Sequence, residues 1–245
     1  MVMQKAFVGQ KIIFLECVDS TNNYTANVFK SGAIDSGTVI LTDIQTNGRG
    51  QRGKEWHSDA FANLLVSIAA DLNLWKIRNL ISLNHIVALA LHKFLSKHTS
   101  EVKIKWPNDI MIKGKKVAGI LIETQITSLQ RKSVIGFGVN INQASFEAPR
   151  ATSLFLATSK THQPKILIYE VIDAFNYFIE VYHQKGEKHL HQLYNDRLWL
   201  KNEEHLFNIN GIEKRGSIIS TSIEGNLLVH FYDGERAFAN GELSY

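Results

Sequence analysis

Residues 48–69 read GRGQRGKEWHSDAFANLLVSIA, a glycine-rich loop that leads into an apolar segment typical of a strand. The three glycines allow the backbone to bend so that successive N–H groups point at one anion, and the interleaved cations add charge-assisted hydrogen bonds. The loop matches G-x-G-x-x-G and nearly matches the P-loop, but with Glu55 where the P-loop has a hydroxyl residue. Both motifs need a helix directly after the loop, and residues 64–69 predict a strand instead. A doubly wound nucleotide-binding fold is therefore disfavoured.

Apolar runs rich in β-branched residues predict strands on both sides of this loop, and four segments show helical periodicity. The predicted strands come in consecutive groups and do not alternate strictly with helices. This order favours an α+β domain with a mixed or antiparallel sheet. The predicted strands are 12–17, 38–42, 64–69, 102–106, 117–124 and 134–141, and the predicted helices are 21–29, 80–95, 166–182 and 189–200.

After about residue 200 the pattern changes to short strands separated by turns of the hairpin type. We expect a small all-β barrel in residues 201–245, which packs on a larger domain formed by residues 1–200 because so short a chain is marginally stable alone. The boundary between the two lies somewhere in residues 195–204. The short strands are 206–209, 215–221, 227–232 and 237–240.

The composition of the 245-residue chain excludes several classes of protein. Hydrophobic residues make up 44% and the mean hydropathy is −0.10, which indicates a folded protein with a full core. Cys17 is the one cysteine, so an internal disulfide is excluded and a reducing compartment is favoured. No stretch approaches the roughly 18 apolar residues of a membrane span, and residues 1–10 lack the apolar run of a signal peptide. We expect a cytoplasmic protein with no membrane partner.

The charge is unevenly distributed along the chain. Residues 201–245 carry four basic and seven acidic residues, which leaves 23 basic and 16 acidic residues in residues 1–200. A basic larger part indicates an anionic partner such as a nucleotide, a nucleic acid or an acidic protein. A solvated basic surface without a partner explains the same balance, and charge alone leaves both interpretations open.

Further short motifs lie at the ends and turns of the predicted strands. Each has a bland explanation: helix capping, an Asn-Asp turn, an edge lysine or core packing. Strand alternation puts Lys116 on the same face as Ala118 and leaves Gly119 on the other. Beside the glycine loop, we interpret Lys116 as a cation aimed at an anionic substrate. The motifs are DSTN at 19–22, KWPND at 105–109, KVAGIL at 116–121 and GFGVN at 136–140.

Together and in this order, the motifs resemble those of the biotin protein ligase family. Gln45 ahead of the glycine loop and Trp56 after it belong to the same pattern. The resemblance is clear over residues 11–142, and NGELS at 240–244 is similar to the end of the family's small carboxy-terminal barrel. Residues 150–200 carry none of these motifs.

The resemblance implies a catalytic domain related to the class II aminoacyl-tRNA synthetases, followed by an SH3-like barrel. It also implies a reaction in two steps. The biotin carboxylate attacks the α-phosphate of ATP, which gives biotinyl-5′-AMP and pyrophosphate. The ε-amine of one lysine on a biotin carboxyl carrier protein, such as that of acetyl-CoA carboxylase, then attacks the mixed anhydride and releases AMP.

This chemistry brings two anions together, so cations must neutralise both. We expect Lys116 and Arg49 to be the catalytic residues, with Lys116 at the carboxylate and α-phosphate and Arg49 closing over the ligand. ATP would bring Mg²⁺, for which we assign no protein ligands. The resemblance implies a set that binds biotin and the adenylate: Ser20, Thr21, Asn22, Gln45, Gly48, Arg49, Gly50, Gln51, Lys116 and Gly119. On the ATP side it implies Lys54, Trp56, Lys105, Asn108, Asp109 and Asn140.

The chain departs from the family pattern in two places. Gln51 stands where the more basic version of the loop has arginine, and Lys54 replaces its last arginine, so retention of the adenylate is in question. Only ten residues precede the first predicted strand, fewer than the roughly 20 that a helix-turn-helix needs. We therefore expect no DNA partner and no repressor role. The family also often forms homodimers, which the residues of this chain neither support nor exclude.

Two alternatives follow from the same sequence. A lipoate or octanoate ligase of the same fold would have little use for the polar residues 20–22 and Gln45. A basic nucleic-acid-binding module would account for the charge, but the basic residues lack the interleaved aromatic side chains of a base-stacking surface. Salt-dependent binding to a random oligonucleotide would support that module, and its absence would reject it.

Overall fold

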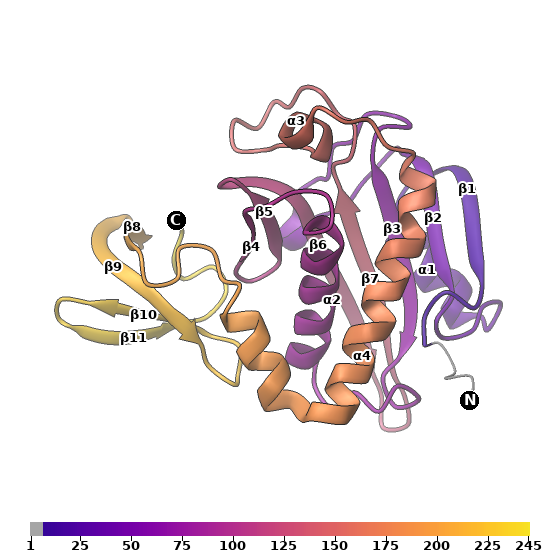
Figure 1. Cartoon of the computed structure of the whole chain (residues 1–245). Helices are drawn as coiled ribbons and strands as arrows, with labels where there is room; N and C mark the ends of the chain where they lie inside the picture. Colours follow the sequence, from indigo (N-terminus) through magenta and orange to yellow (C-terminus); the bar gives the residue numbers. More distant parts are fainter. Residues whose placement is uncertain (1–6) are drawn as a thin grey trace.

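The computed structural model describes residues 7–245 and contains two sheets with helices packed on the larger one (Figure 1). Residues 1–6, part of the stretch for which neither a signal peptide nor a helix-turn-helix is expected, lie outside the described residues. The strands of the larger sheet are β1 (Ile12–Val18), β2 (Val39–Gln45), β3 (Leu64–Asp71), β4 (Val102–Lys105), β5 (Asp109–Ile112), β6 (Lys115–Ile126) and β7 (Arg131–Val139). The helices are α1 (Thr21–Lys30), α2 (Leu80–Leu95), α3 (Leu154–Thr158) and α4 (Pro164–Asn195), with a 3-10 turn η1 at Gln51–Gly53.

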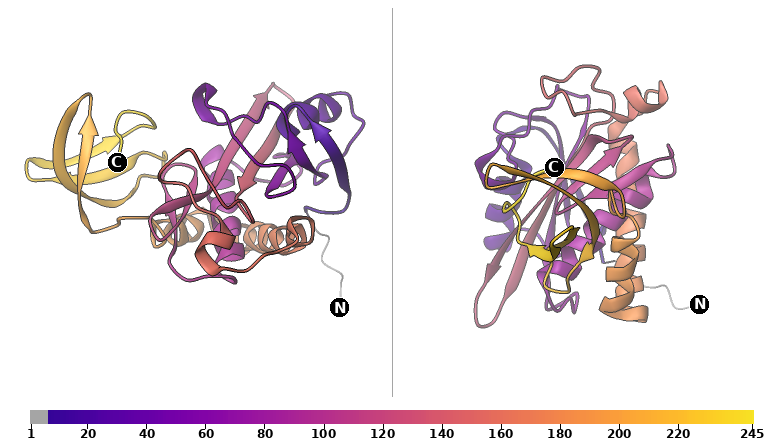
Figure 2. Two further views of the ribbon diagram at one scale, coloured as in Figure 1. Left: turned by 90° about the horizontal axis from the view of Figure 1, so that it is seen from above. Right: turned by 90° about the vertical axis from the view of Figure 1, so that its left-hand side faces the viewer.

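The larger sheet has seven strands in the order β1-β2-β3-β7-β6-β5-β4. β1 and β2 are parallel and the other neighbours are antiparallel, which confirms the predicted α+β class with a mixed sheet. Helices α2 and α4 pack on each other and cover one face of the sheet, while α1 lies on the opposite side (Figures 1 and 2). Only the face under α2 and α4 is covered by a large hydrophobic core, so the other face has room for a site.

Alternation along β7 separates the two faces of the sheet. Ile135, Phe137 and Val139 belong to the core under the helices. Gly136 and Gly138 therefore point to the opposite face, because successive residues of a strand alternate. The second face lacks side chains at these two positions, and side chains from other segments approach the backbone there.

A β-bulge changes the alternation along β6. The pairing with β5 shifts between Ile110 and Met111, so that Val117 has no partner on that strand. Val117 and Ala118 consequently both pack into the core. A Cβ on Gly119 would lie 3.2 Å from Lys116 Nζ, which shows that Lys116 shares the face of Gly119. The predicted pairing of Lys116 with Ala118 is therefore wrong, because regular alternation does not hold across a bulge.

The carboxy-terminal strands form an antiparallel sheet of their own, in the order β11-β10-β9-β8. An isolated bridge between Asn208 and Ser244 brings the last residues beside β8. This sheet stands to one side of the larger one (Figure 2). The division of the chain into domains at residue 200 stays a prediction. The strands are β8 (Glu204–Ile209), β9 (Ile212–Thr221), β10 (Leu227–Phe231) and β11 (Gly234–Phe238).

Other details of the predicted elements differ from the structure. The sequence patterns do not predict β5 or α3, both of which are short. The two predicted helices in residues 166–200 form the single element α4, which is interrupted by a kink at Gly186 and ends at Asn195. Within the described residues no helix is long and apolar enough to cross a membrane.

Candidate active site

A narrow cavity of about 50 Å³ lies on the sheet face opposite α2 and α4. Its floor is formed by Gly119, Gly136 and Gly138 of β6 and β7. A Cβ on Gly136 would collide with the side-chain amide of Asn22, and a Cβ on Gly138 would collide with the indole of Trp56. These glycines are thus needed because two side chains lie directly on the backbone of the strands.

One end of the narrow cavity is a connected set of polar groups. The backbone N–H and the hydroxyl of Thr21 both donate to Gln45 Oε1, at 2.8 and 3.0 Å. The buried hydroxyl of Ser67 donates to Asn22 Oδ1 at 2.6 Å and lies 2.8 Å from the hydroxyl of Thr21. Ser20 occupies the N-cap position of α1 but makes no side-chain capping bond, so capping does not explain this motif. Gln45 satisfies the first N–H of α1 in its place, and Ser20, Thr21, Asn22 and Gln45 all line the cavity.

The other end of the narrow cavity holds a cation. Lys116 Nζ lies 2.8 Å from Asp109 Oδ1 and 5.5 Å from the centre of the Trp56 ring. Asp109 faces Gly119 in the β5–β6 ladder, so the ammonium group reaches across from one strand toward the next. A half-exposed ion pair of this kind contributes little to stability, but it holds the ammonium group at the cavity.

The glycine loop covers the narrow cavity. Arg49 makes a two-pronged ion pair with Glu123 of β6, at 2.7 and 3.2 Å, and also donates to Asn23 Oδ1 at 2.8 Å. Arg52 has a left-handed backbone conformation, with φ of 56°, and its guanidinium donates to the backbone oxygen of Asn240. The loop therefore touches α1, β6 and the segment that follows β11 at once.

A cleft of about 550 Å³ opens between the glycine loop and the small sheet, and we call it the inter-sheet cleft. Lys105 donates to the backbone oxygen of Tyr245 at 2.7 Å and lies over the rings of Tyr245 and Trp199. Burial lowers the pKa of Lys105 below its usual value, Asp109 opposes this shift, and the neighbouring cations add to it. The concentration of cations makes the cleft suited to a polyanion such as a triphosphate. The predicted residues that line it are Gly50, Gln51, Lys54, Trp56, Lys105, Asn108, Asp109 and Lys116.

A second opening, the wide cleft, has a volume of about 1050 Å³ and lies on the other side of Trp56. Asn140 lines it with a side chain that is only 4% exposed. Asn140 Nδ2 donates to the backbone oxygen of Thr152 at 2.9 Å, while Asn140 Oδ1 is buried without a hydrogen-bond partner. An unpaired buried acceptor is costly, so a donor group on a ligand would be stabilised there.

The structure brings the predicted site residues to these three adjoining spaces. Gly48 borders the wide cleft, and every other member of the predicted biotin set lines the narrow cavity. The predicted ATP residues are divided, because Asn140 lies in the wide cleft and Lys105 in the inter-sheet cleft. Trp56 borders all three spaces.

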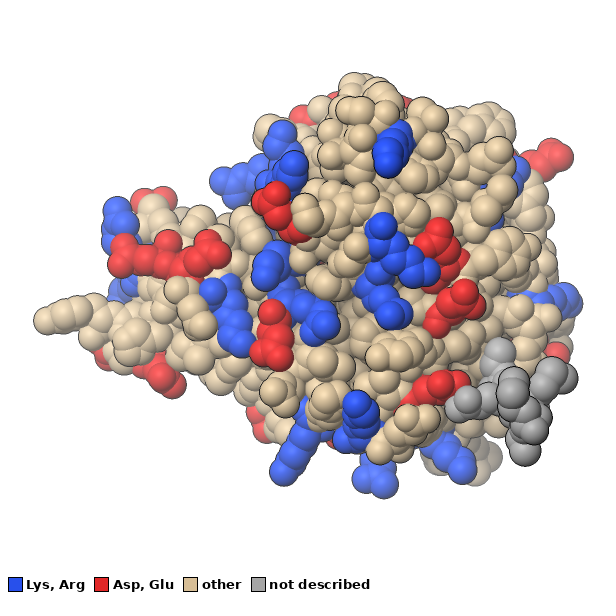
Figure 3. Space-filling view, in the orientation of Figure 1, with Lys and Arg blue, Asp and Glu red and all other residues tan. Residues whose placement is uncertain are grey.

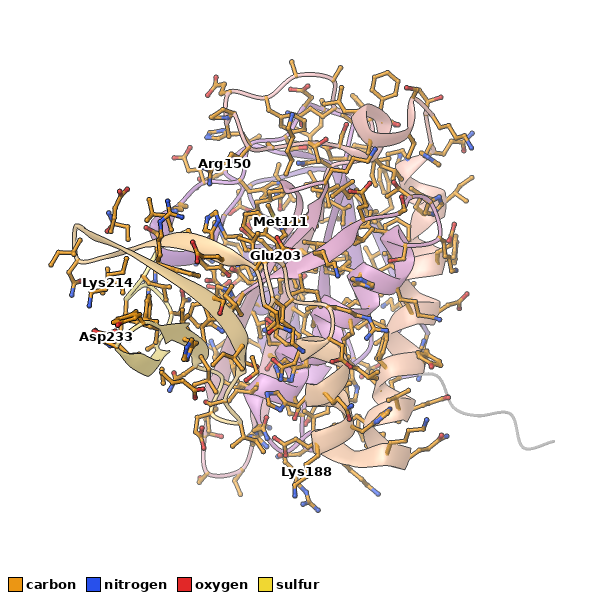
Figure 4. All side chains as sticks on the ribbon, turned by 60° about the vertical axis from the view of Figure 1, so that its left-hand side comes forward. Met111, Arg150, Lys188, Glu203, Lys214 and Asp233 are labelled. Atoms are coloured by element: carbon orange, nitrogen blue, oxygen red, sulfur yellow. The ribbon has the colours of Figure 1, made fainter. Side chains whose placement is uncertain are left out.

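The sequence patterns miss several residues of the site. Ser67 and Glu123 could have been found as polar residues on the alternate face of otherwise apolar strands. Arg150 is exposed at the end of the main sheet that faces the small sheet (Figure 4), and its charge acts on Lys105. Its backbone oxygen accepts from Lys116 N at 2.7 Å. No local signal marks Arg150, which is brought to the site by the return of the chain after β7.

The uneven charge of the sequence is visible on the surface. On the face shown in Figure 3, acidic side chains gather on the small sheet, and basic side chains are spread over the larger body. On the small sheet itself Lys214 pairs with Asp233 at 3.2 Å, and both are labelled in Figure 4. The excess of positive charge therefore lies on the larger body and not on the small sheet.

Comparison with known proteins identifies a matching family. The model of the Biotin/lipoate A/B protein ligase family matches residues 14–140. The bifunctional ligase/repressor BirA of Bacillus spizizenii is 33% identical over 177 residues, which are 69% of this chain and 53% of that protein. The biotin–[acetyl-CoA-carboxylase] ligase of Mycobacterium tuberculosis is 32% identical over 149 residues, or 57% and 54% of the two chains. The chain thus spans about half the length of the curated relatives it matches.

Among solved structures, the biotin protein ligase of Aquifex aeolicus in complex with biotin and ATP superposes with a TM-score of 0.80 and 26% identity. The superposition covers 96% of this chain and 98% of that one. It includes the small sheet as well as the larger one, whereas the family model ends at residue 140. Because the family model spans more than half of the chain, the chain belongs to the Biotin/lipoate A/B protein ligase family.

Proposed function

We propose that this protein is an ATP-dependent ligase that activates biotin as biotinyl-5′-AMP and transfers it to a lysine of a biotin carboxyl carrier protein. The observation that carries the proposal is the polarity of the narrow cavity. Polar groups that include Gln45 lie at one end and the ammonium group of Lys116 at the other. A ligand with a hydrogen-bonding ring at one end and a carboxylate at the other matches this arrangement. Biotin has this shape.

Lys116 supplies the charge that the first step needs. Its ammonium group would bind the biotin carboxylate and an oxygen of the α-phosphate, and so stabilise negative charge as the new P–O bond forms and pyrophosphate leaves. Lys54, Lys105 and Arg150 would neutralise the triphosphate in the inter-sheet cleft. In the second step, the amine nitrogen of the carrier lysine attacks the carbonyl carbon and AMP leaves with the former α-phosphate.

Asn140 would bind the nucleotide from the wide cleft. Its Oδ1 is a buried acceptor without a partner, and the amino group of adenine is a donor of the right kind. Trp56 borders both the narrow cavity and the wide cleft, so it lies where a base or the biotin ring could stack on it. The loop that carries Trp56 would exclude water from the adenylate.

Mg²⁺ would enter this site with ATP. The described residues contain no cluster of three histidine, cysteine or carboxylate side chains that could hold a metal by themselves. Mg²⁺ commonly binds through one or two carboxylates together with substrate phosphates, and Asp109 provides one carboxylate in the inter-sheet cleft. The bound ion would neutralise charge on the triphosphate.

A transfer assay distinguishes this function from that of a lipoate ligase. The full chain is incubated with ATP, a biotin carboxyl carrier domain and either radiolabelled biotin or radiolabelled lipoate. We expect label in the carrier with biotin, and none when the target lysine of the carrier is replaced by arginine. Transfer of lipoate without transfer of biotin would overturn the assignment.

A further inference from the structure

Glu123 joins three segments of the candidate site through one carboxylate. It accepts from both terminal nitrogens of Arg49, at 2.7 Å to Nη2 and 3.2 Å to Nη1. The same carboxylate accepts from Asn22 Nδ2 at 2.9 Å. Arg49 belongs to the glycine loop, Asn22 to α1 and Glu123 to β6. A two-pronged arginine–carboxylate pair fixes the orientation of both partners as well as their distance.

This contact lies at the polar end of the narrow cavity, away from Lys116. The ammonium group of Lys116 lies beside Gly119, four residues before Glu123 on β6. The carboxylate of Glu123 lies beside Asn22 Nδ2, which also donates to the backbone oxygen of Leu121, two residues beyond Gly119 on β6. While Arg49 is bound to Glu123, its guanidinium is engaged by that carboxylate and is not free to pair with the phosphate that Lys116 would bind. Arg49 acts in this position on the loop and on the polar end of the cavity.

A small set of contacts holds the glycine loop closed. Its backbone hydrogen bonds run within the loop, from Gly50 N to Lys54 O and from Trp56 N to Gly48 O. Arg49 meets Glu123 and Asn23. Gln51 and Arg52 meet Asn240, in the segment after β11. Trp56 packs on the backbone of Gly138. Of these contacts, the pair of Arg49 with Glu123 is the ion pair that ties the loop to the larger sheet, and Arg49 lines the narrow cavity.

We propose that Glu123 is a positioning residue that holds the glycine loop closed over the bound ligand through Arg49. This inference rests on the proposed function and adds to it the residue that sets how long biotin and the adenylate stay bound. Opening the loop requires the ion pair to break, so Glu123 controls release. The chemical step takes place at Lys116, and Glu123 acts on the loop and not on the reacting atoms.

The test uses the full chain and the substitution Glu123→Gln. An amide keeps an oxygen that accepts from Asn22 but removes the charge that binds Arg49. Glu204→Gln is the matched control, because it removes the same charge from an exposed pair with Arg215 on the small sheet. Labelled adenylate is formed from biotin and ATP, its loss is followed after a chase with unlabelled substrates, and the single-turnover rate of adenylate formation is measured at saturating biotin.

We expect release from Glu123→Gln to be about fivefold faster, the effect of losing a partly exposed charged pair, and we expect the change in the release rate to exceed the change in the rate of adenylate formation. The Arg49→Ala variant should release the adenylate equally fast, and the double variant should release it no faster than either single variant. Release at the wild-type rate, or additive effects in the double variant, would overturn the inference and leave the ligase function standing. If the wild-type protein forms no adenylate, both proposals fall. If Glu123→Gln does not fold, Arg49→Ala tests the same effect on the release of the adenylate, because Arg49 lies in the exposed loop.

Discussion

At the scale of single residues, the narrow cavity depends on positions where a side chain is missing. Gly136 and Gly138 occupy the face of β7 that Asn22 and Trp56 approach, and the neighbouring residues of the strand fill the core on the other face. The glycines could be found in the sequence, but not the side chains that lie on them. Ser67 and Glu123 complete the polar network. The sequences of the strands that carry them indicate only a structural role.

Gly136→Ala tests this close approach. The added methyl group would displace the amide of Asn22 and break its hydrogen bond with Ser67, which leaves buried polar groups without partners. We expect a loss of about 1–3 kcal/mol of stability and weaker binding of biotin. Urea denaturation and calorimetry of biotin binding measure the two effects. Stability and affinity equal to those of the wild type would show that Asn22 has no fixed role in the cavity.

Gln51→Arg tests the departure of the loop from the basic pattern of the family. Gln51 lines the narrow cavity, and its Oε1 accepts from Asn240 Nδ2 at 3.3 Å. A guanidinium at this position would add charge next to the adenylate phosphate, so we expect slower release of the adenylate. The chase experiment described for Glu123 measures the rate, with Gln51→Lys as a control for charge without the planar fork. Unchanged or faster release from Gln51→Arg would refute the hypothesis.

At the scale of elements, the long periodic segments were predictable and the short or irregular ones were not. The predicted helix 80–95 has the bounds of α2, because its apolar residues repeat over several turns. β5 has only four residues and follows a proline turn, and so it gives too short a pattern to be distinguished from a loop. The bulge at Val117 reversed the predicted face of Lys116, since pairing between strands is a long-range property that local alternation does not contain.

The kink in α4 can be tested by a substitution, also at the scale of elements. Gly186 adopts φ of 80° and ψ of 175°, a conformation that residues with a side chain avoid. We expect Gly186→Ala to cost about 1–3 kcal/mol, while Gln184→Ala, at an exposed position of the same helix, costs little. The midpoints of urea unfolding compare the two variants. Equal midpoints for the two variants would show that alanine adopts the backbone conformation of Gly186 without strain.

At the scale of the whole molecule, buried histidines link stability to pH. His85 of α2 stacks against His191 and Tyr194 of α4, with ring centres 5.4 and 4.2 Å away. Burial lowers the pKa of His85 to about 3, and the neighbouring His191 adds to the shift. In the unfolded chain the same group titrates near its ordinary value of about 6.5. Protonation of His85 thus favours unfolding. The stability that neutral His85 maintains is fully present above about pH 6.5 and is lost as the pH falls below that value.

His85→Leu should remove this part of the acid sensitivity. Between about pH 6 and pH 4 the unfolded wild-type chain binds one more proton at this position, which lowers stability by about 1.4 kcal/mol per pH unit. We expect the variant to lose less stability than the wild type over this range, as measured by urea unfolding at each pH. His230→Leu, at an exposed position of the small sheet, is the control. Parallel curves for His85→Leu and wild type would contradict the account.

The central claim is that Lys116 lies at the reacting centre of a biotin-activating enzyme. The most direct measurement is the biotin-dependent exchange of pyrophosphate into ATP, with the wild-type chain and Lys116→Ala compared side by side. We predict exchange that requires biotin in the wild type and falls by at least about a hundredfold in Lys116→Ala, because the variant loses the charge that stabilises the transition state. No exchange by the wild type, or exchange that persists in Lys116→Ala, would contradict the claim.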